Sequence, residues 1–242
     1  SISPPRLLIG CIVGLCHPLP TQTNIDTKIL ARQWTLSVKI WVIETMIGAK
    51  MDNAFQSDHF LLKRQVFALT GKFRLYNPQG QLVMYSQQKM FKLREDIRIY
   101  ADEAKTRELL YIQARQIIDF AAAYDVVDSQ SGMKVGVLRR QGFRSLVQDE
   151  WQVLDAADQP IGILREDSLT QALLRRFLLG TFLPQNYDLL FADTRVADLR
   201  QRFNLFRYEL DIDCSMDTAR RLDRRMAVAA GILLATVEGK QS

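Results

Sequence analysis

Histidine and cysteine are scarce in this chain, and their scarcity argues against several kinds of catalysis. The 242 residues include two histidines, His17 and His59, and three cysteines, Cys11, Cys16 and Cys214. Nucleophilic catalysis of the Ser-His-Asp or Cys-His type requires a histidine base beside its nucleophile, and a zinc site requires clustered His and Cys ligands. The sequence has no such cluster, no Cys-x-x-Cys pair and no glycine-rich phosphate loop. We therefore expect a protein that is not an enzyme, has no cofactor and lies in the reducing cytoplasm.

Long hydrophobic runs are missing as well. The longest apolar segment after residue 50 runs from Met226 to Val237, with Thr236 as its one polar residue. A helix of this length spans about 18 Å, whereas a bilayer core of about 30 Å needs about 20 apolar residues. We therefore expect no transmembrane span. Because apolar residues fall on every side of this helix, it is predicted to be a buried core helix, built around Met226, Val228, Ala230, Gly231, Leu233 and Leu234.

Net charge is small over most of the chain. The formal charge of +5 divides into +3 for residues 1–50 and +2 for residues 51–242, which hold 27 basic and 25 acidic groups. Affinity for phosphate must therefore come from local clusters of basic residues. We expect no nucleic-acid partner.

The first 50 residues differ in composition from the rest. An apolar run of ten residues, Leu7 to Cys16, follows one arginine, as in a short signal sequence, but the expected cleavage site is missing. An ordinary polar stretch then begins at Met51. We predict that residues 1–50 are an N-terminal extension, either not native or disordered, and that residues 51–242 form one domain.

Four segments repeat one pattern, in which an aromatic residue is followed by alternating apolar and polar residues. In three of them, Asn or Asp and other turn-forming residues separate two such runs, which is the signature of a β-hairpin. The fourth has a less clear turn near Asp193. The segments are 73–88, 124–140, 151–167 and 187–203.

More strands are expected at 89–102 and 107–120, and another at 207–216, where apolar and polar residues alternate strictly. Residues 51–65 are interpreted as a polar start, with His59 ahead of the first strand. The total is about eleven or twelve strands in a row.

Two helices are expected beside these strands. A capping box and a stop glycine predict one over 168–180, and the terminal apolar helix is expected to have Ser215 or Asp217 as its N-cap. Many antiparallel strands tend to close on themselves, which removes exposed edges. The predicted fold is mainly β, a closed antiparallel barrel of about 12 strands around the buried C-terminal helix.

This order of elements resembles the Tubby C-terminal-like superfamily, and most of all its scramblase-like and LURP-one-related members. The resemblance covers about residues 58–240 and implies a non-enzymatic module that binds a membrane surface or anionic lipid, in the cytoplasm or peripheral to a membrane. Two alternatives are a protein–protein interaction or scaffold barrel without a small ligand, and phospholipid scrambling. The segments that carry the resemblance are 73–86, 124–140, 149–167 and 222–239.

Clusters of arginine are the candidates for lipid binding. Guanidinium groups suit phosphate, and Tubby domains bind phosphoinositide head groups through basic residues outside the barrel. The alternative is a solvated face whose arginines pair with nearby acids, and it applies equally to the arginines at 220, 221, 224 and 225. The candidate lipid-binding residues are Arg139, Arg140, Arg144, Arg175 and Arg176.

A weaker pattern concerns calcium. Asp211, Asp213 and Asp217, with Ser215 between the last two, fall at alternate positions like the first ligands of a calcium loop. Scramblase-like proteins carry an acidic calcium segment just before the final helix. The sixth position of such a loop should be glycine and is Met216, and the twelfth should be glutamate and is Leu222. The alternative is a strand whose polar face meets water.

Overall fold

The computed structural model describes residues 52–65, 70–89, 96–115, 122–141, 150–167, 184–202, 204 and 207–238. Contacts divide the chain into two units between Lys50 and Met51, and every described residue belongs to the second unit. The origin of residues 1–50 stays a prediction. The helix expected over 168–180 lies outside the described residues.

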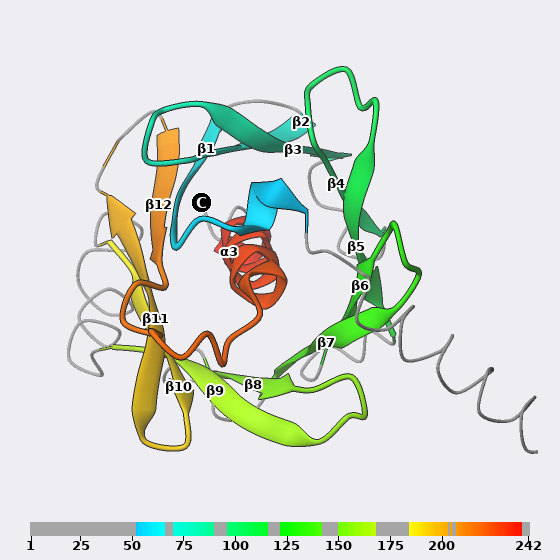
Figure 1. Ribbon diagram of the computed structural model, residues 1–242. Helices are drawn as coiled ribbons and strands as arrows, with labels where there is room; N and C mark the ends of the chain where they lie inside the picture. Colours follow the sequence, from blue (N-terminus) through cyan, green and yellow to red (C-terminus); the bar gives the residue numbers. More distant parts are fainter. Residues whose placement is uncertain are drawn as a thin grey trace, which may run out of the picture. The chain divides into compact units, whose positions relative to one another are not determined.

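Twelve strands form one closed antiparallel barrel, as predicted (Figure 1). Each strand pairs with its neighbours in the sequence, and β1 pairs with β12 to close the ring. The strands are β1 (His59–Gln65), β2 (Thr70–Tyr76), β3 (Leu82–Lys89), β4 (Ile97–Tyr100), β5 (Glu108–Ala114), β6 (Ala123–Asp128), β7 (Lys134–Arg140), β8 (Glu150–Leu154), β9 (Pro160–Glu166), β10 (Asn186–Phe191), β11 (Thr194–Arg202) and β12 (Arg207–Asp213).

The hairpin pattern in the sequence has a local cause. Asn77 and Asp155 directly follow a strand and Asp128 ends one, and the side-chain oxygen of each accepts a hydrogen bond from a backbone N–H of the turn that follows. Such side-chain bonds favour turns over continued strand. Gly80 and Gly132, with φ of 74° and 68°, supply the left-handed position in two of these turns.

The interpretation of residues 51–65 as a polar start is wrong, because His59 begins a strand that closes the barrel. β1 pairs with β12 along its whole length, from His59 with Asp213 to Gln65 with Arg207. Two inward positions, Phe60 and Leu62, are apolar and buried, but the third is Arg64. One charged inward residue in so short a strand hides the alternation that would have revealed it.

The helix α3 (Arg224–Glu238) runs through the middle of this ring, as Figure 1 shows. From Met226 to Ala235 every residue is buried, so the expected core helix is found inside the barrel. The N-cap predictions of Ser215 and Asp217 are wrong. Asp223 takes this position, and its carboxylate accepts a hydrogen bond of 2.9 Å from the backbone N–H of Arg225.

Glycine occupies positions where α3 and the strands around it come closest. A Cβ added at Gly231 of α3 would lie 2.6 Å from Cδ1 of Ile212 on β12. One added at Gly136 of β7 would lie 2.9 Å from the sulfur of Met226 and 2.6 Å from the carbonyl oxygen of Leu154. The barrel therefore holds its helix without spare space at these levels.

We call the end of the barrel where α3 begins the mouth. The short 3-10 helix η1 (Asn53–Phe55) is drawn across this end in Figure 1. Phe55 belongs to the buried core, and the carboxylate of Asp52 accepts hydrogen bonds from Arg107 and from Gln130 in two of the neighbouring loops. Residues 52–58 thus cover the N-terminal end of α3.

Candidate functional site

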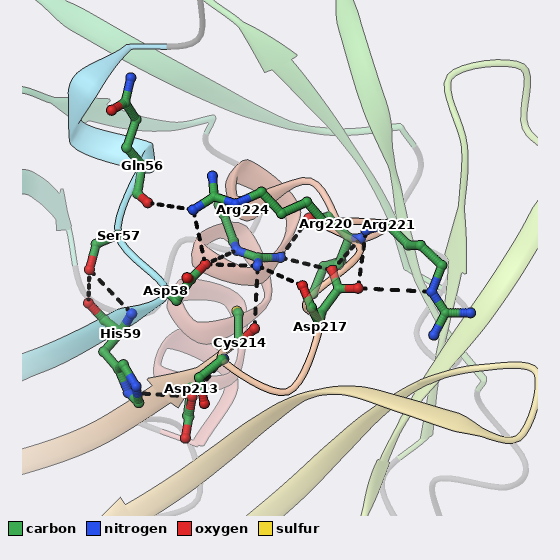
Figure 2. Close-up of polar contacts among 12 residues, drawn as sticks. Gln56, Ser57, Asp58, His59, Asp213, Cys214, Asp217, Arg220, Arg221 and Arg224 are labelled. Atoms are coloured by element: carbon green, nitrogen blue, oxygen red, sulfur yellow. Dashed lines mark hydrogen bonds and ion pairs between the residues drawn. The ribbon is translucent and has the colours of Figure 1, made fainter.

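The mouth contains a buried arginine, Arg224, at the first position of α3 (Figure 2). Its guanidinium donates to the Asp58 carboxylate at 2.8 and 3.0 Å and to the Asp217 carboxylate at 3.0 Å. It also donates to the carbonyl oxygens of Leu222 and Cys214. Only 2% of its side chain is exposed. Arg224 therefore fastens the segment before β1, the loop after β12 and the helix to one another.

Asp217 is the second buried member of this group. Burial of its carboxyl opposes ionisation, but hydrogen bonds from the backbone N–H of Leu222 and from Arg224 outweigh it and hold the pKa of Asp217 below its usual value. A further backbone bond comes from Arg221. The ionised Asp217 therefore holds the loop that leads into α3 in place.

The other arginines of the mouth are paired as well. The pairs are Arg220 with Asp58, Arg221 with Asp217, and Arg225 with both Asp128 and Asp223. For the arginines at 220, 221, 224 and 225, the structure therefore agrees with the alternative of pairing with nearby acids. Their role in the described part of the chain is to hold the mouth together.

The cysteine and the histidine of the described chain lie in places that do not suit catalysis of the Cys-His or Ser-His type. Cys214 is buried, and burial raises the pKa of its thiol to about 12, so it stays protonated. His59 is half exposed, and its Nδ1 lies 3.4 Å from the Asp213 carboxylate on the outside of the barrel. The hydroxyl of the nearby Ser57 is hydrogen-bonded to the backbone carbonyl and N–H of His59, which are not the groups that act as a catalytic base.

The structure separates the arginines that were predicted to bind lipid. Arg140 follows Gly136 and Leu138 on the inward face of β7, whereas Arg139 points outward, since adjacent strand residues face opposite ways. Arg144, Arg175 and Arg176 lie outside the described residues. Of the five, Arg139 is therefore the one that the structure places on the outer surface, and lipid binding by this set stays a prediction.

The aspartates of the calcium pattern have different partners. Asp211 is paired with Arg202, Asp213 accepts a hydrogen bond from the backbone N–H of Ser215, and Asp217 is buried against Arg224. Among the described residues, no group of three or more His, Cys, Asp and Glu side chains could hold a metal ion. The structure does not bring the three carboxylates together, and calcium binding stays a prediction.

One feature of the outer surface was missed in the sequence. All four outward-facing tyrosines lie on β2 to β5, and each has a cation near its ring, at 4.9 to 5.9 Å from the ring centre. Tyr76, Tyr100 and Tyr111 are partly exposed, whereas Tyr85 is covered by its neighbours and only 3% exposed. The other three tyrosines of the chain, Tyr124, Tyr187 and Tyr208, belong to the buried core. We call the outer face of β1 to β5 the tyrosine wall; its members are Lys63, Lys72, Arg74, Tyr76, Tyr85, Arg98, Tyr100, Lys105 and Tyr111.

The outer face of β8 to β12, here called the acidic wall, has a different composition. Asp188 and Asp198 are direct cross-strand partners, and Arg195 and Arg200 bridge their carboxylates. Desolvation and the hydrogen bond with Asp198 raise the pKa of Asp188. Asp198 is in turn the cross-strand partner of Asp213. A row of three carboxylates therefore crosses β10, β11 and β12.

Neither wall was visible as such in the sequence, because each is assembled from alternate residues of separate strands. The tyrosine wall could have been predicted from the outward-facing positions of the alternating segments 73–88, 97–100 and 108–114. In those segments Tyr and Arg or Lys occupy the positions between the buried apolar residues.

None of the helices in the described chain is long and apolar enough to cross a membrane.

Comparison with known proteins agrees with this architecture. Neither a curated protein nor a solved structure matches the chain. A family model described as LURP-one-related matches residues 82–235, from the start of β3 into the last turns of α3. The match covers more than half of the sequence and includes most of the barrel with its central helix. The chain therefore belongs to the LURP-one-related family.

Proposed function

We propose that this barrel is a non-enzymatic module that binds an anionic membrane surface through the outside of its wall. The observation that carries the proposal is the filled lumen. Along α3, the residues from Met226 to Ala235 are buried against the strands, so a ligand of the described barrel has its outer surface available for contact. Binding sites for small molecules are usually concave and open, and a lumen packed with a helix is neither.

The chemistry of the reactive side chains supports a binding role over catalysis. Cys214 is protonated and buried, and His59 lies on the outer surface beside Asp213. Arg139 is partly exposed on the outer face of β7, and a residue that contacts lipid phosphate must be exposed. The proposed location is cytoplasmic and peripheral to the membrane.

A second candidate is a protein–protein interaction barrel. Tyrosine and arginine are enriched at protein interfaces, and the tyrosine wall displays both. Phospholipid scrambling has less support, because it needs a route across the bilayer and the described chain contains no helix that could span one.

Flotation of the intact chain with lipid vesicles tests the proposal. We expect co-flotation with vesicles of phosphatidylserine and phosphatidylcholine, and little with phosphatidylcholine alone. Binding should be lost at about 1 M salt, where the Debye length falls to about 3 Å. Equal recovery with both kinds of vesicle, or none with either at low salt, would contradict membrane binding and favour the protein partner.

A further inference from the structure

We infer that the barrel docks on an anionic membrane with its tyrosine wall toward the lipid and its acidic wall away from it. The inference rests on the proposed function and adds the orientation and the contact residues. It comes from the unequal distribution of charge and tyrosine around the ring of strands.

Charge differs strongly between the two halves of the barrel. Among the described residues from His59 to Ala114, which include β1 to β5, there are eight Lys and Arg and four Asp and Glu, a net charge of +4. Among those from Glu150 to Asp213, which include β8 to β12, there are five Lys and Arg and eleven Asp and Glu, a net charge of −6. An anionic surface therefore attracts one side of the barrel and repels the other.

Two cations of the tyrosine wall are exposed and form no ion pair with another residue of the described chain, although Lys72 is close enough to Glu103 to help lower the pKa of that carboxyl. Lys72 on β2 is exposed, and Lys105, in the loop between β4 and β5, is exposed beside the ring of Tyr100. Arg74 and Arg98 are instead paired with Glu103 and Glu108, at 2.6 and 2.7 Å. Lys72 and Lys105 are thus the charges of this wall that lipid phosphate meets first.

The tyrosines supply the second part of the contact. Tyr76 on β2, Tyr100 on β4 and Tyr111 on β5 are partly exposed. Tyrosine is enriched at membrane–water interfaces because its ring is apolar and its hydroxyl is polar. The tyrosine wall combines this side chain with cations, whereas the described acidic wall has no tyrosine on its outer face. A lipid surface therefore fits the first wall better than the second.

Docking on the membrane through the face that contains Arg139 would be a competing orientation. Arg139 lies on β7, between the two walls, and its cross-strand partners are Ala123 and Gln152. It offers one outward cation without a neighbouring outward tyrosine, so we place it at the edge of the contact. Replacing it tests the competing orientation directly.

Vesicle flotation with two charge-matched double variants tests the inference in the intact chain. Lys72→Gln with Lys105→Gln removes two charges from the tyrosine wall. Arg165→Gln with Arg207→Gln removes two exposed charges from the acidic wall and leaves the same net charge. Each basic residue near an anionic leaflet contributes an affinity factor of about five, so the first pair should weaken binding about 10- to 30-fold. The second pair should change binding less than about twofold, and both should melt like the wild type.

The outcomes separate the inference from the proposed function. If the wild type binds vesicles and the two pairs weaken binding equally, or Arg139→Gln weakens it more than the lysine pair, the orientation is wrong while membrane binding stands. If the wild type binds no vesicle at low salt, the proposed function fails and the orientation with it. Binding to soluble polyglutamate without binding to vesicles would assign the tyrosine wall to an acidic protein partner, which also overturns the inference.

Discussion

Inward-facing and outward-facing residues of the same strands differ in nearly every property. The inward residues and α3 form one continuous buried core in which most members are apolar. The outward residues include tyrosines and many charged groups joined in pairs, such as Arg98 with Glu108 and Arg202 with Asp211. Apolar burial contributes far more to stability than exposed ion pairs do. Folding therefore depends on the residues that face the lumen, whereas the outer faces of the strands are free to carry recognition.

The largest effect should come from a charge placed in the lumen. Leu233 on α3 is buried, so Leu233→Asp would bury a carboxylate without a partner. Because a domain of this kind is stable by about 5–15 kcal/mol, we expect the variant to lose its cooperative thermal transition, measured by circular dichroism. Leu190→Asp on the outer face of β10, beside Arg195, is the matched control and should still fold. An unchanged melting temperature for Leu233→Asp would contradict the threaded barrel.

The next largest loss of stability is expected at the mouth, because it contains buried charges. Asp217→Asn removes the carboxylate that Arg224 contacts at 3.0 Å, and the remaining partner, Asp58, is partly exposed. Breaking a buried pair on one side costs about 3 kcal/mol or more. Chemical denaturation should show this loss. Arg221→Ala, which removes only an exposed partner of Asp217, should cost less than about 1 kcal/mol; equal losses in the two variants would refute a special role for the buried pair.

The pH dependence of stability, compared between the wild type and Asp217→Asn, tests whether Asp217 is ionised in the folded protein. The pKa of Asp217 is lower in the folded state than its usual value of about 3.9, so its stabilisation is complete above that value. It is lost as the pH falls through the lower folded-state pKa. The difference in unfolding free energy between wild type and Asp217→Asn should therefore be constant near neutral pH and shrink below about pH 4. A difference that grows on acidification would show that Asp217 is not ionised in the fold.

A smaller loss of stability is expected at the contact between α3 and the inner side of β12. Gly231→Leu would overpack the contact with Ile212, at a cost of about 1–3 kcal/mol. Gly231→Ala should cost less, because the nearest atom is the terminal methyl group of Ile212, which can move. Thermal melting of both variants would give this order, and two variants as stable as the wild type would mean that the helix has free space there.

The smallest effect should come from the outer wall. Arg202→Ala removes an ion pair with Asp211 in which more than half of the arginine side chain is exposed. Such a pair contributes about 0–1 kcal/mol. We expect a change in melting temperature of a few degrees at most, and none at high salt. A loss as large as that of Asp217→Asn would remove the distinction between wall and lumen.

Much of the fold could be predicted from the sequence because its signals are local. The Asn and Asp residues that begin the turns, and the alternation in β6 to β9, act within a few residues of one another. The missed strand β1 shows the limit, since it has two buried apolar residues, Phe60 and Leu62, and is recognised as a strand chiefly by its pairing with β12. The N-cap shows the same limit, because Asp217 has the chemistry of a cap but is used by Arg224 and the loop before it.

The sequence by itself determined the class of fold, the buried character of α3 and the scarcity of histidine and cysteine, because composition and periodicity act along the chain. Tertiary structure alone decided which arginines are available. It turned Arg140 inward and Arg139 outward, paired the arginines of the mouth with Asp58, Asp128, Asp217 and Asp223, and gathered tyrosines from four strands on one side. The physical reason is that an ion pair or a surface patch joins residues far apart in sequence, and only closure of the barrel sets the distances between them.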